Sequence, residues 1–189
     1  MCGIAGLIHK GKSSNVGGEM TAMLQALKHR GPDSTGYAVY GEPTEGDYVL
    51  RLKVAEAEDM AKGRGIHQVL ADRIAAVEAI MQEHGVTVKT KENATEYALR
   101  YLISHEGDTT ALAEHIEETD GVEILSLGNG LELIKDLGDA SDVAGLYGLN
   151  EFSGTHGIGH TRMATESDVD IRSAHPYWAF PYNDVSVVH

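Results

Sequence analysis

The residue with the clearest chemical potential is Cys2, the only cysteine of the 189-residue chain, which lies one position from its start. If Met1 is removed, the thiol and a free α-amino group belong to the same residue. An α-amino group titrates near pH ~8, so it can accept a proton from the adjacent thiol and return it later. Cys2 would then supply both a nucleophile and its base.

A lone cysteine is more often a small buried hydrophobe, and position alone leaves that interpretation open. The run from Gly3 to Ile8 is apolar and interrupted by glycines, which is typical of a buried strand. Such a strand would hold Cys2 at its exposed tip. The run therefore favours an active site at the start of the chain.

A second candidate group is Arg162 with Thr165, near the end of a glycine-spaced, β-like run that begins at Gly154. A fixed guanidinium beside a hydroxyl suits fork-like binding of a carboxylate. The alternative is an ordinary surface arginine at a strand end. His156 and His160 lie in the same run, but i and i+4 positions of a strand do not form the ligand pair that they form on a helix, so we predict no metal site.

A third candidate is the segment that starts at Arg30 and Gly31. Pro32 ends a predicted helix here, and Asp33 and Ser34 are turn formers. The segment is either a plain helix-to-strand turn or a loop whose backbone and Arg30 face the Cys2 tip. Turn chemistry leaves both interpretations open.

Composition narrows the class of protein. The chain is 42% hydrophobic and 23% charged, which is ordinary for a globular domain, and its formal net charge is −14. That charge argues against non-specific nucleic-acid binding. No apolar run is long enough to cross a membrane, the start lacks the basic region of a signal peptide, and one cysteine fits a reducing compartment. We therefore predict a cytoplasmic protein without nucleic-acid or membrane partners.

Hydrophobic periodicity predicts the elements that must position these residues. The first part of the chain should contain the Cys2 strand, a helix over residues 18–29 with Met20, Met23, Leu24 and Leu27 on its core side, and a strand over 37–40. The last part should contain a strand over 131–136 and a short helix capped by Asp139 or Ser141 and running to Tyr147. The β-like run over 154–165 and a terminal strand over 185–189 should follow.

The middle of the chain has a different character. Together with the strand over residues 48–54, this middle part has the predicted order β-α-β-β-α-β, which is typical of a ferredoxin-like segment. The elements that follow the first strand are a helix over 66–81, strands near 86–89 and 97–103, an acidic helix over 108–119 and a strand over 122–127. We assign residues 1–54 and 128–189 to one domain and residues 55–127 to an inserted α+β segment. The acidic side chains of the insert are expected to form a solvated face.

Four stretches together resemble the class II glutamine amidotransferases, which are N-terminal-nucleophile hydrolases. The resemblance covers roughly residues 1–54 and 152–189, and it rests on Cys2-Gly3-Ile4-Ala5-Gly6, His29-Arg30-Gly31-Pro32-Asp33-Ser34-x-Gly36, His160-Thr161-Arg162-x-Ala164-Thr165 and Ala174-His175-Pro176. The nearest likeness is the stand-alone glutaminase subunit related to glutamate synthase and N-methylglutamate synthase. The sequence from Thr161 to Ser167 and the long central insert indicate that branch of the family.

The resemblance implies an α+β fold of αββα type, with two antiparallel sheets between helical layers. It implies that Cys2 attacks the side-chain amide of glutamine and that ammonia passes to a partner synthase domain or subunit. Arg162 would bind the substrate α-carboxylate with help from Thr165, and Arg30 and Gly31 would hold the Cys2 end of the site. The sequence has no flavin, iron–sulfur or nucleotide motif, so we expect no cofactor in this chain.

The sequence departs from the family pattern at its end. The family places Asn-Gly directly after the equivalent of His189, and that Asn helps to form the oxyanion hole, whose loss can lower a rate by ~10²–10³-fold. We therefore expect a fold that is incomplete at its C-terminus and a 189-residue form that is inactive alone. The alternatives are a non-catalytic glutamine-sensing or assembly module and a different terminal-cysteine hydrolase.

Overall fold

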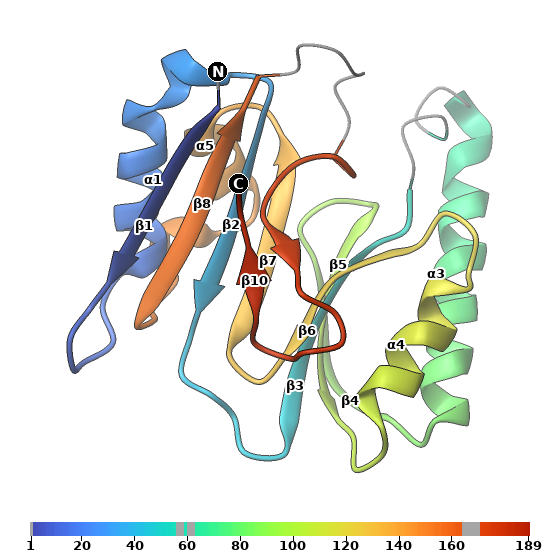
Figure 1. The fold of residues 1–189 in the computed structure, drawn as a ribbon. Helices are drawn as coiled ribbons and strands as arrows, with labels where there is room; N and C mark the ends of the chain where they lie inside the picture. The colour runs from blue at the N-terminus through green and yellow to red at the C-terminus, as the bar shows by residue number, and fades with distance from the viewer. Residues whose placement is uncertain (1, 56–58, 60–62, 164–170) are drawn as a thin grey trace. The chain divides into compact units, whose positions relative to one another are not determined.

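The computed structural model describes residues 2–55, 59, 63–163 and 171–189. Within them the chain has the expected α+β class, with two four-stranded antiparallel sheets and four α-helices. The chain divides into two compact units, one of residues 1–43 and 130–189 and the other of residues 44–129 (Figure 1). None of the helices in the described ranges is long and apolar enough to span a bilayer.

The first unit is built on a sheet with the strand order β1-β8-β2-β7. All neighbouring pairs are antiparallel. The strands are β1 (Gly3–Ile8), β2 (Ser34–Tyr40), β7 (Leu131–Leu137) and β8 (His156–Arg162). A short ribbon of β9 (Tyr177–Trp178) and β10 (Ser186–Val187) follows, so only part of the expected terminal strand over 185–189 forms.

Two helices pack on one face of this sheet. Helix α1 (Val16–Ala26) is capped by the side chain of Asn15, and α5 (Ala140–Leu146) is capped by Asp139, which accepts hydrogen bonds from the N–H groups of residues 141 and 142. Met20 and Leu24 of α1 are fully buried against the sheet residues Ala5, Tyr37, Val39 and Ile134. This face of the sheet forms the apolar core of the unit, and we call it the helix face.

Helix α1 differs in two respects from the prediction. It begins at Val16, two residues earlier than expected, because Asn15 provides the cap, and it ends at Ala26 before a 3-10 turn over Lys28–Arg30. Met23 is 39% exposed, so its predicted place in the core was wrong. Met20 and Leu24 are one helical turn apart and lie on the side of α1 that packs against the sheet, whereas Met23 lies outside that side.

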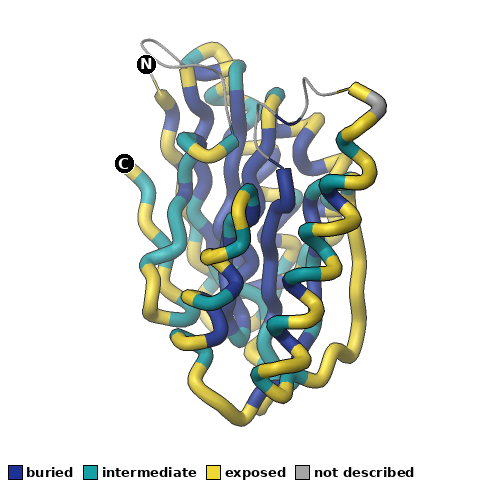
Figure 2. The backbone as a smooth tube through the Cα atoms, turned by 90° about the vertical axis from the view of Figure 1, so that its right-hand side faces the viewer, coloured by how far each residue is buried: buried dark blue, intermediate teal, exposed yellow. Residues whose placement is uncertain are grey.

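The second unit has the predicted order of elements, β-α-β-β-α-β, among its described residues. Its strands are β3 (Asp47–Lys53), β4 (Thr87–Asn93), β5 (Ala98–Ser104) and β6 (Glu123–Gly128), and its helices are α3 (Ile66–Glu83) and α4 (Thr109–Glu117). The sheet order is β4-β5-β3-β6. Every residue of the edge strand β4 is exposed, whereas β3 and β5 are mostly buried (Figure 2).

The boundaries between the compact units lie at residues 43/44 and 129/130, whereas the predicted segment boundaries were 54/55 and 127/128. The difference arises because β3 pairs with β5 and β6 and therefore belongs to the second unit. The assignment of the first unit to a glutaminase domain stays a prediction.

Candidate functional site

The strand register of the first unit brings Cys2 and Arg162 to the same end of the sheet. In the β1–β8 pair Gly3 lies opposite Thr161; Cys2 directly precedes Gly3, and Arg162 directly follows Thr161. Residues directly opposite in an antiparallel pair have Cα atoms about 4.5–5.5 Å apart. Cys2 is exposed, and Arg162 is only 9% exposed. Cys2 and Arg162 therefore lie at the same end of the sheet, where β1 begins and β8 ends (Figure 1).

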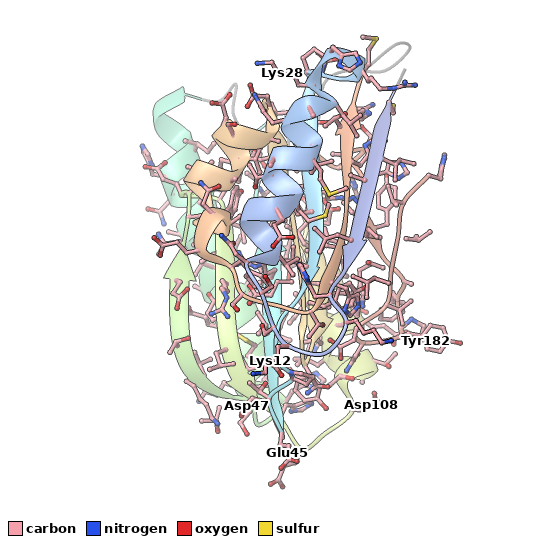
Figure 3. The ribbon with its side chains drawn as sticks, turned by 90° about the vertical axis from the view of Figure 1, so that its left-hand side faces the viewer. Lys12, Lys28, Glu45, Asp47, Asp108 and Tyr182 are labelled. Carbon is pink, nitrogen blue, oxygen red and sulfur yellow. The ribbon has the colours of Figure 1, made fainter. Side chains whose placement is uncertain are left out.

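The turn after α1 lies at the same end. Figure 3 labels Lys28 at the end of α1, and the next residues carry the chain back toward β1 and β8. Arg30 donates a hydrogen bond from Nε to the carbonyl oxygen of Cys2 at 3.2 Å. This contact holds the backbone of Cys2 in place and leaves its thiol exposed.

Gly31 lies against the backbone of β8. A Cβ atom at this position would stand 2.4 Å from the carbonyl carbon of Arg162, so any larger residue would displace the strand end. The backbone N–H of Asp33 then donates to the carbonyl oxygen of Arg162 at 3.1 Å. The structure thus brings four predicted site residues together, Cys2, Arg30, Gly31 and Arg162. Thr165, the fifth, lies outside the described residues.

The side of the sheet away from α1 carries a set of polar side chains. Side chains alternate along a strand, so His160 and Arg162 of β8 point to this side, while Gly159 and Thr161 meet α1 and its C-terminal turn. Ser34 of β2 is directly opposite Arg162 and shares its side. Lys135 of β7, which is 2% exposed, is opposite Gly36 on the same side. We call this side, defined by Ser34, Lys135, His160 and Arg162, the polar face.

The segment that follows residue 170 covers part of the polar face. A Cβ atom on Gly36 would stand 1.9 Å from the carbonyl oxygen of His175, so only glycine allows this close approach. Lys135 donates to the carbonyl oxygen of Arg172 at 3.2 Å, and its Nζ lies 4.8 Å from the ring centroid of Tyr177. Residues 172–177 therefore pack across the middle of the sheet, over Gly36 and Lys135, while Cys2 is exposed.

Three histidines from distant parts of the sequence meet on the polar face. The ring centroid of His175 is 5.0 Å from that of His160 and 4.7 Å from that of His189. Burial of the His160 ring lowers its pKa to about 4, and electrostatic repulsion from His175, His189 and Arg162 acts in the same direction. Burial also lowers the pKa of His175, with His189, Lys135 and Arg162 acting in the same direction. At neutral pH the His160 ring is therefore neutral and can donate one hydrogen bond and accept another.

No group of three or more His, Cys, Asp or Glu side chains in the described part of the chain has the arrangement of a metal site. The cationic and neutral donors of the polar face instead suit an anionic ligand. Sequence reasoning singled out Arg162 there but missed Ser34 and His160 as ligand-binding candidates. The alternation of side chains along the Gly154–Thr165 run could have placed His160 beside Arg162. The position of Ser34 depends on the pairing of β2 with β8, which the sequence does not reveal.

Comparison with known proteins adds a separate line of evidence. No protein-family model matches the chain. It is 37% identical over 192 residues to the "Putative glutamine amidotransferase" of Methanothermobacter thermautotrophicus, and the match covers all of this chain and 60% of that protein. The chain is homologous to proteins named as glutamine amidotransferases.

The second relative is the "Glutamine amidotransferase-like protein GlxB" of Rhizobium meliloti. It is 33% identical over 180 residues, which cover 94% of this chain and 54% of the relative. The chain thus spans somewhat more than half the length of the two curated relatives.

Proposed function

We propose that this chain is the glutaminase module of a class II, N-terminal-nucleophile glutamine amidotransferase of the branch related to glutamate synthase. The observation that carries the proposal is the register of β1 against β8, which brings the exposed residue Cys2 and the buried residue Arg162 to the same end of a sheet. The relatives support the same substrate by their names.

The chemistry uses Cys2 as both nucleophile and base. Once Met1 is removed, the α-amine accepts the thiol proton while Sγ attacks the side-chain carboxamide carbon of glutamine. The amine then returns that proton to the amide nitrogen, the C–N bond breaks, and ammonia leaves. Water attacks the resulting γ-glutamyl thioester, releases glutamate and restores the thiol. Ammonia passes to a partner synthase domain or subunit.

The other site residues position the two ends of the substrate. Arg162 binds the α-carboxylate, with Thr165 as its proposed helper. Arg30 holds the Cys2 carbonyl oxygen, and Gly31 allows the turn to lie against the end of β8. Substrate binding between a nucleophile and a cation on adjacent strands would place the carboxamide next to Sγ, and such positioning is a large part of any acyl-transfer rate.

The test is glutamate release from glutamine by the full-length protein from which Met1 has been removed, and by its Cys2→Ala and Cys2→Ser variants, because the 189 residues alone are expected to be inactive. We expect Cys2→Ala to lower the rate at least about a thousand-fold, since removing a nucleophile removes the covalent path. Mass spectrometry of the wild-type N-terminus should show that Met1 is absent, and rapid quenching should trap a γ-glutamyl adduct. Cys2 is the only cysteine, so the adduct has one possible thiol site.

Two results would count against the proposal. Equal glutamate release by wild type and Cys2→Ala would remove Cys2 from the reaction. Tight binding of glutamine without turnover, in protein that has lost Met1, would favour the glutamine-sensing module instead. In the absence of an acceptor, ammonia should appear in solution in equal amount to glutamate.

A further inference from the structure

The polar face carries two buried side chains whose polar atoms have no hydrogen-bond partner among the described residues. They are the hydroxyl of Ser34, which is fully buried, and both ring nitrogens of His160, which is 1% exposed. Buried polar groups in folded proteins are almost always paired, and an exception needs an explanation. The two exceptions here lie on the same face as Arg162.

The strand register fixes how these residues are arranged. Ser34 is directly across from Arg162 in the β2–β8 pair, where Cβ atoms are about 4.5–5.5 Å apart. His160 is two residues before Arg162 on β8, so their Cα atoms are about 6–7 Å apart along the strand. The hydroxyl and the imidazole therefore flank the guanidinium on two sides, one across the sheet and one along it.

The chemistry of this set is that of hydrogen-bond donation to an anion. A hydroxyl and a neutral imidazole each carry one donor, and a guanidinium carries five. Among the described residues, the titratable groups that act on His160 are His175, His189 and Arg162, and none of these three is an acid. A carboxylate has acceptor sites only, so it is the kind of ligand that could accept hydrogen bonds from the hydroxyl and the imidazole beside the guanidinium.

We propose that Ser34 and His160 are substrate-binding residues, and that they donate hydrogen bonds to the same glutamine α-carboxylate that Arg162 holds. The inference rests on the proposed function, because it takes glutamine as the ligand of this face. It extends that function by assigning carboxylate specificity to two side chains from different strands. Bound substrate gives both side chains the hydrogen-bond partners that the fold itself does not supply.

The experiment compares L-glutamine with L-glutaminamide, in which the α-carboxylate is replaced by a neutral amide. We expect Ser34→Ala to raise KM for L-glutamine about tenfold with kcat nearly unchanged, since one hydrogen bond to a charged group is lost. For L-glutaminamide the same substitution should raise KM less than about threefold. His160→Phe should behave like Ser34→Ala, and His160→Gln, which keeps an N–H donor, should restore part of the loss.

Matched controls come from the same unit. His156→Gln changes another histidine on the same strand and the same side, four residues away, where its ring stacks on Tyr40 at a centroid distance of 4.0 Å. Ser141→Ala removes an exposed serine hydroxyl from α5. Both should leave the preference for L-glutamine over L-glutaminamide unchanged.

Calorimetric binding of both ligands is measured on the same proteins, so that the two proposals can fail separately. Ser34→Ala and His160→Phe variants that weaken both ligands equally would show a structural role and overturn this inference, while wild-type turnover would leave the proposed function intact. Wild type that binds L-glutamine without turnover would overturn the proposed function. Binding that depends on Ser34 and on the carboxylate would still support this inference.

Discussion

The two faces of the sheet in the first unit differ in whether their buried polar side chains have hydrogen-bond partners. On the helix face, the Tyr37 hydroxyl donates to the carbonyl oxygen of Ala140 at 2.8 Å, and the Thr35 hydroxyl donates to that of Gly138 at 2.9 Å. On the polar face, the Ser34 hydroxyl and the His160 ring have no such partner within the described ranges. The same strands therefore present one face with its polar groups paired and one with two buried groups unpaired.

The difference shows which face is optimised for folding. An unpaired buried polar group costs about 1–3 kcal/mol, and replacing it with an apolar group of the same shape is often neutral or stabilising. The helix face follows the rules of a stable core. The polar face departs from them at the end of the sheet where Cys2 lies, and such departures are expected where a ligand completes the hydrogen bonding.

The largest effect should come from removing the cation of the polar face. Arg162→Ala should lower kcat/KM for glutamine by about 10²–10³-fold, because truncating one partner of a buried charge pair costs several kcal/mol. Arg162→Lys should recover only part of the loss, since an ammonium lacks the two-pronged geometry of a guanidinium. Steady-state kinetics on both variants checks this. Wild-type kcat/KM in Arg162→Ala would mean that the polar face does not bind the substrate.

The next effect should come from the glycine that lets the chain cover the polar face. Gly36→Ala would place a Cβ atom 1.9 Å from the His175 carbonyl oxygen, so the covering segment must move. We expect a loss of about 1–3 kcal/mol in the free energy of unfolding, as for other overpacked sites.

Gly145→Ala is the control for this substitution. Gly145 lies within α5, and a Cβ atom added there would meet nothing within 4 Å apart from its chain neighbours and the backbone of its own helix. Alanine should therefore stabilise the helix by about 0.5–1 kcal/mol. Chemical denaturation followed by the fluorescence of Trp178, the only tryptophan, reports on this unit. Equal stability of the two variants would contradict the close packing of residue 36 against His175.

Much of the fold follows from local sequence. The periodicity of Gly3–Ile8 and the cap formed by Asp139 predicted elements that the structure contains, because strand alternation and helix capping act over a few residues. The predicted segment boundary at 54/55 differs from the boundary between the compact units at 43/44, since the membership of β3 depends on pairing with β5 and β6, which are far away in the sequence. Local patterns cannot supply such pairings.

The same limit applies to the candidate site. Cys2, Arg30, Gly31 and Arg162 are recognisable as residue types in short motifs, and the structure brings them to one sheet end. The sequence marks Ser34 only as a turn former, because its place opposite Arg162 is set by the register of β2 against β8. The pairing of strands, and not the motif, decides which face a side chain joins.

The stability of the protein should depend on pH because of His160 on the polar face. Its pKa of about 4 lies below the ordinary value of 6.5 because the ring is buried. Between pH 6.5 and pH 4, His160 is protonated in the unfolded chain but stays neutral in the folded chain. The free energy of unfolding should therefore be highest above about pH 6.5 and should fall as the pH drops toward 4. The loss should be at most about 3 kcal/mol. His175, whose pKa is also lowered, acts in the same direction. Within the described residues, His189, Arg162 and Lys135 are the other groups whose charge acts on the two rings.

The measurement is the free energy of unfolding at several pH values, again from Trp178 fluorescence. His160→Gln has no proton to take up, so its stability should depend less on pH than that of the wild type over this window. An unchanged slope in His160→Gln would show that other groups cause the pH dependence. Bound glutamine should reduce the slope of the wild type, because a carboxylate beside His160 raises the pKa of the ring.

The smallest effects give the sharpest comparison of the two faces. Tyr37→Phe removes a hydroxyl that is paired on the helix face and leaves the Ala140 carbonyl oxygen without it, so stability should fall by about 1–2 kcal/mol with little change in KM. Ser34→Ala removes a hydroxyl that is unpaired on the polar face, so stability should change by less than about 0.5 kcal/mol or rise, while KM for glutamine rises. Chemical denaturation and steady-state kinetics measure the free energy of unfolding and the KM for glutamine of both variants. If Ser34→Ala lost as much stability as Tyr37→Phe, the Ser34 hydroxyl would have a partner in the fold, and the contrast between the faces would no longer point to a ligand.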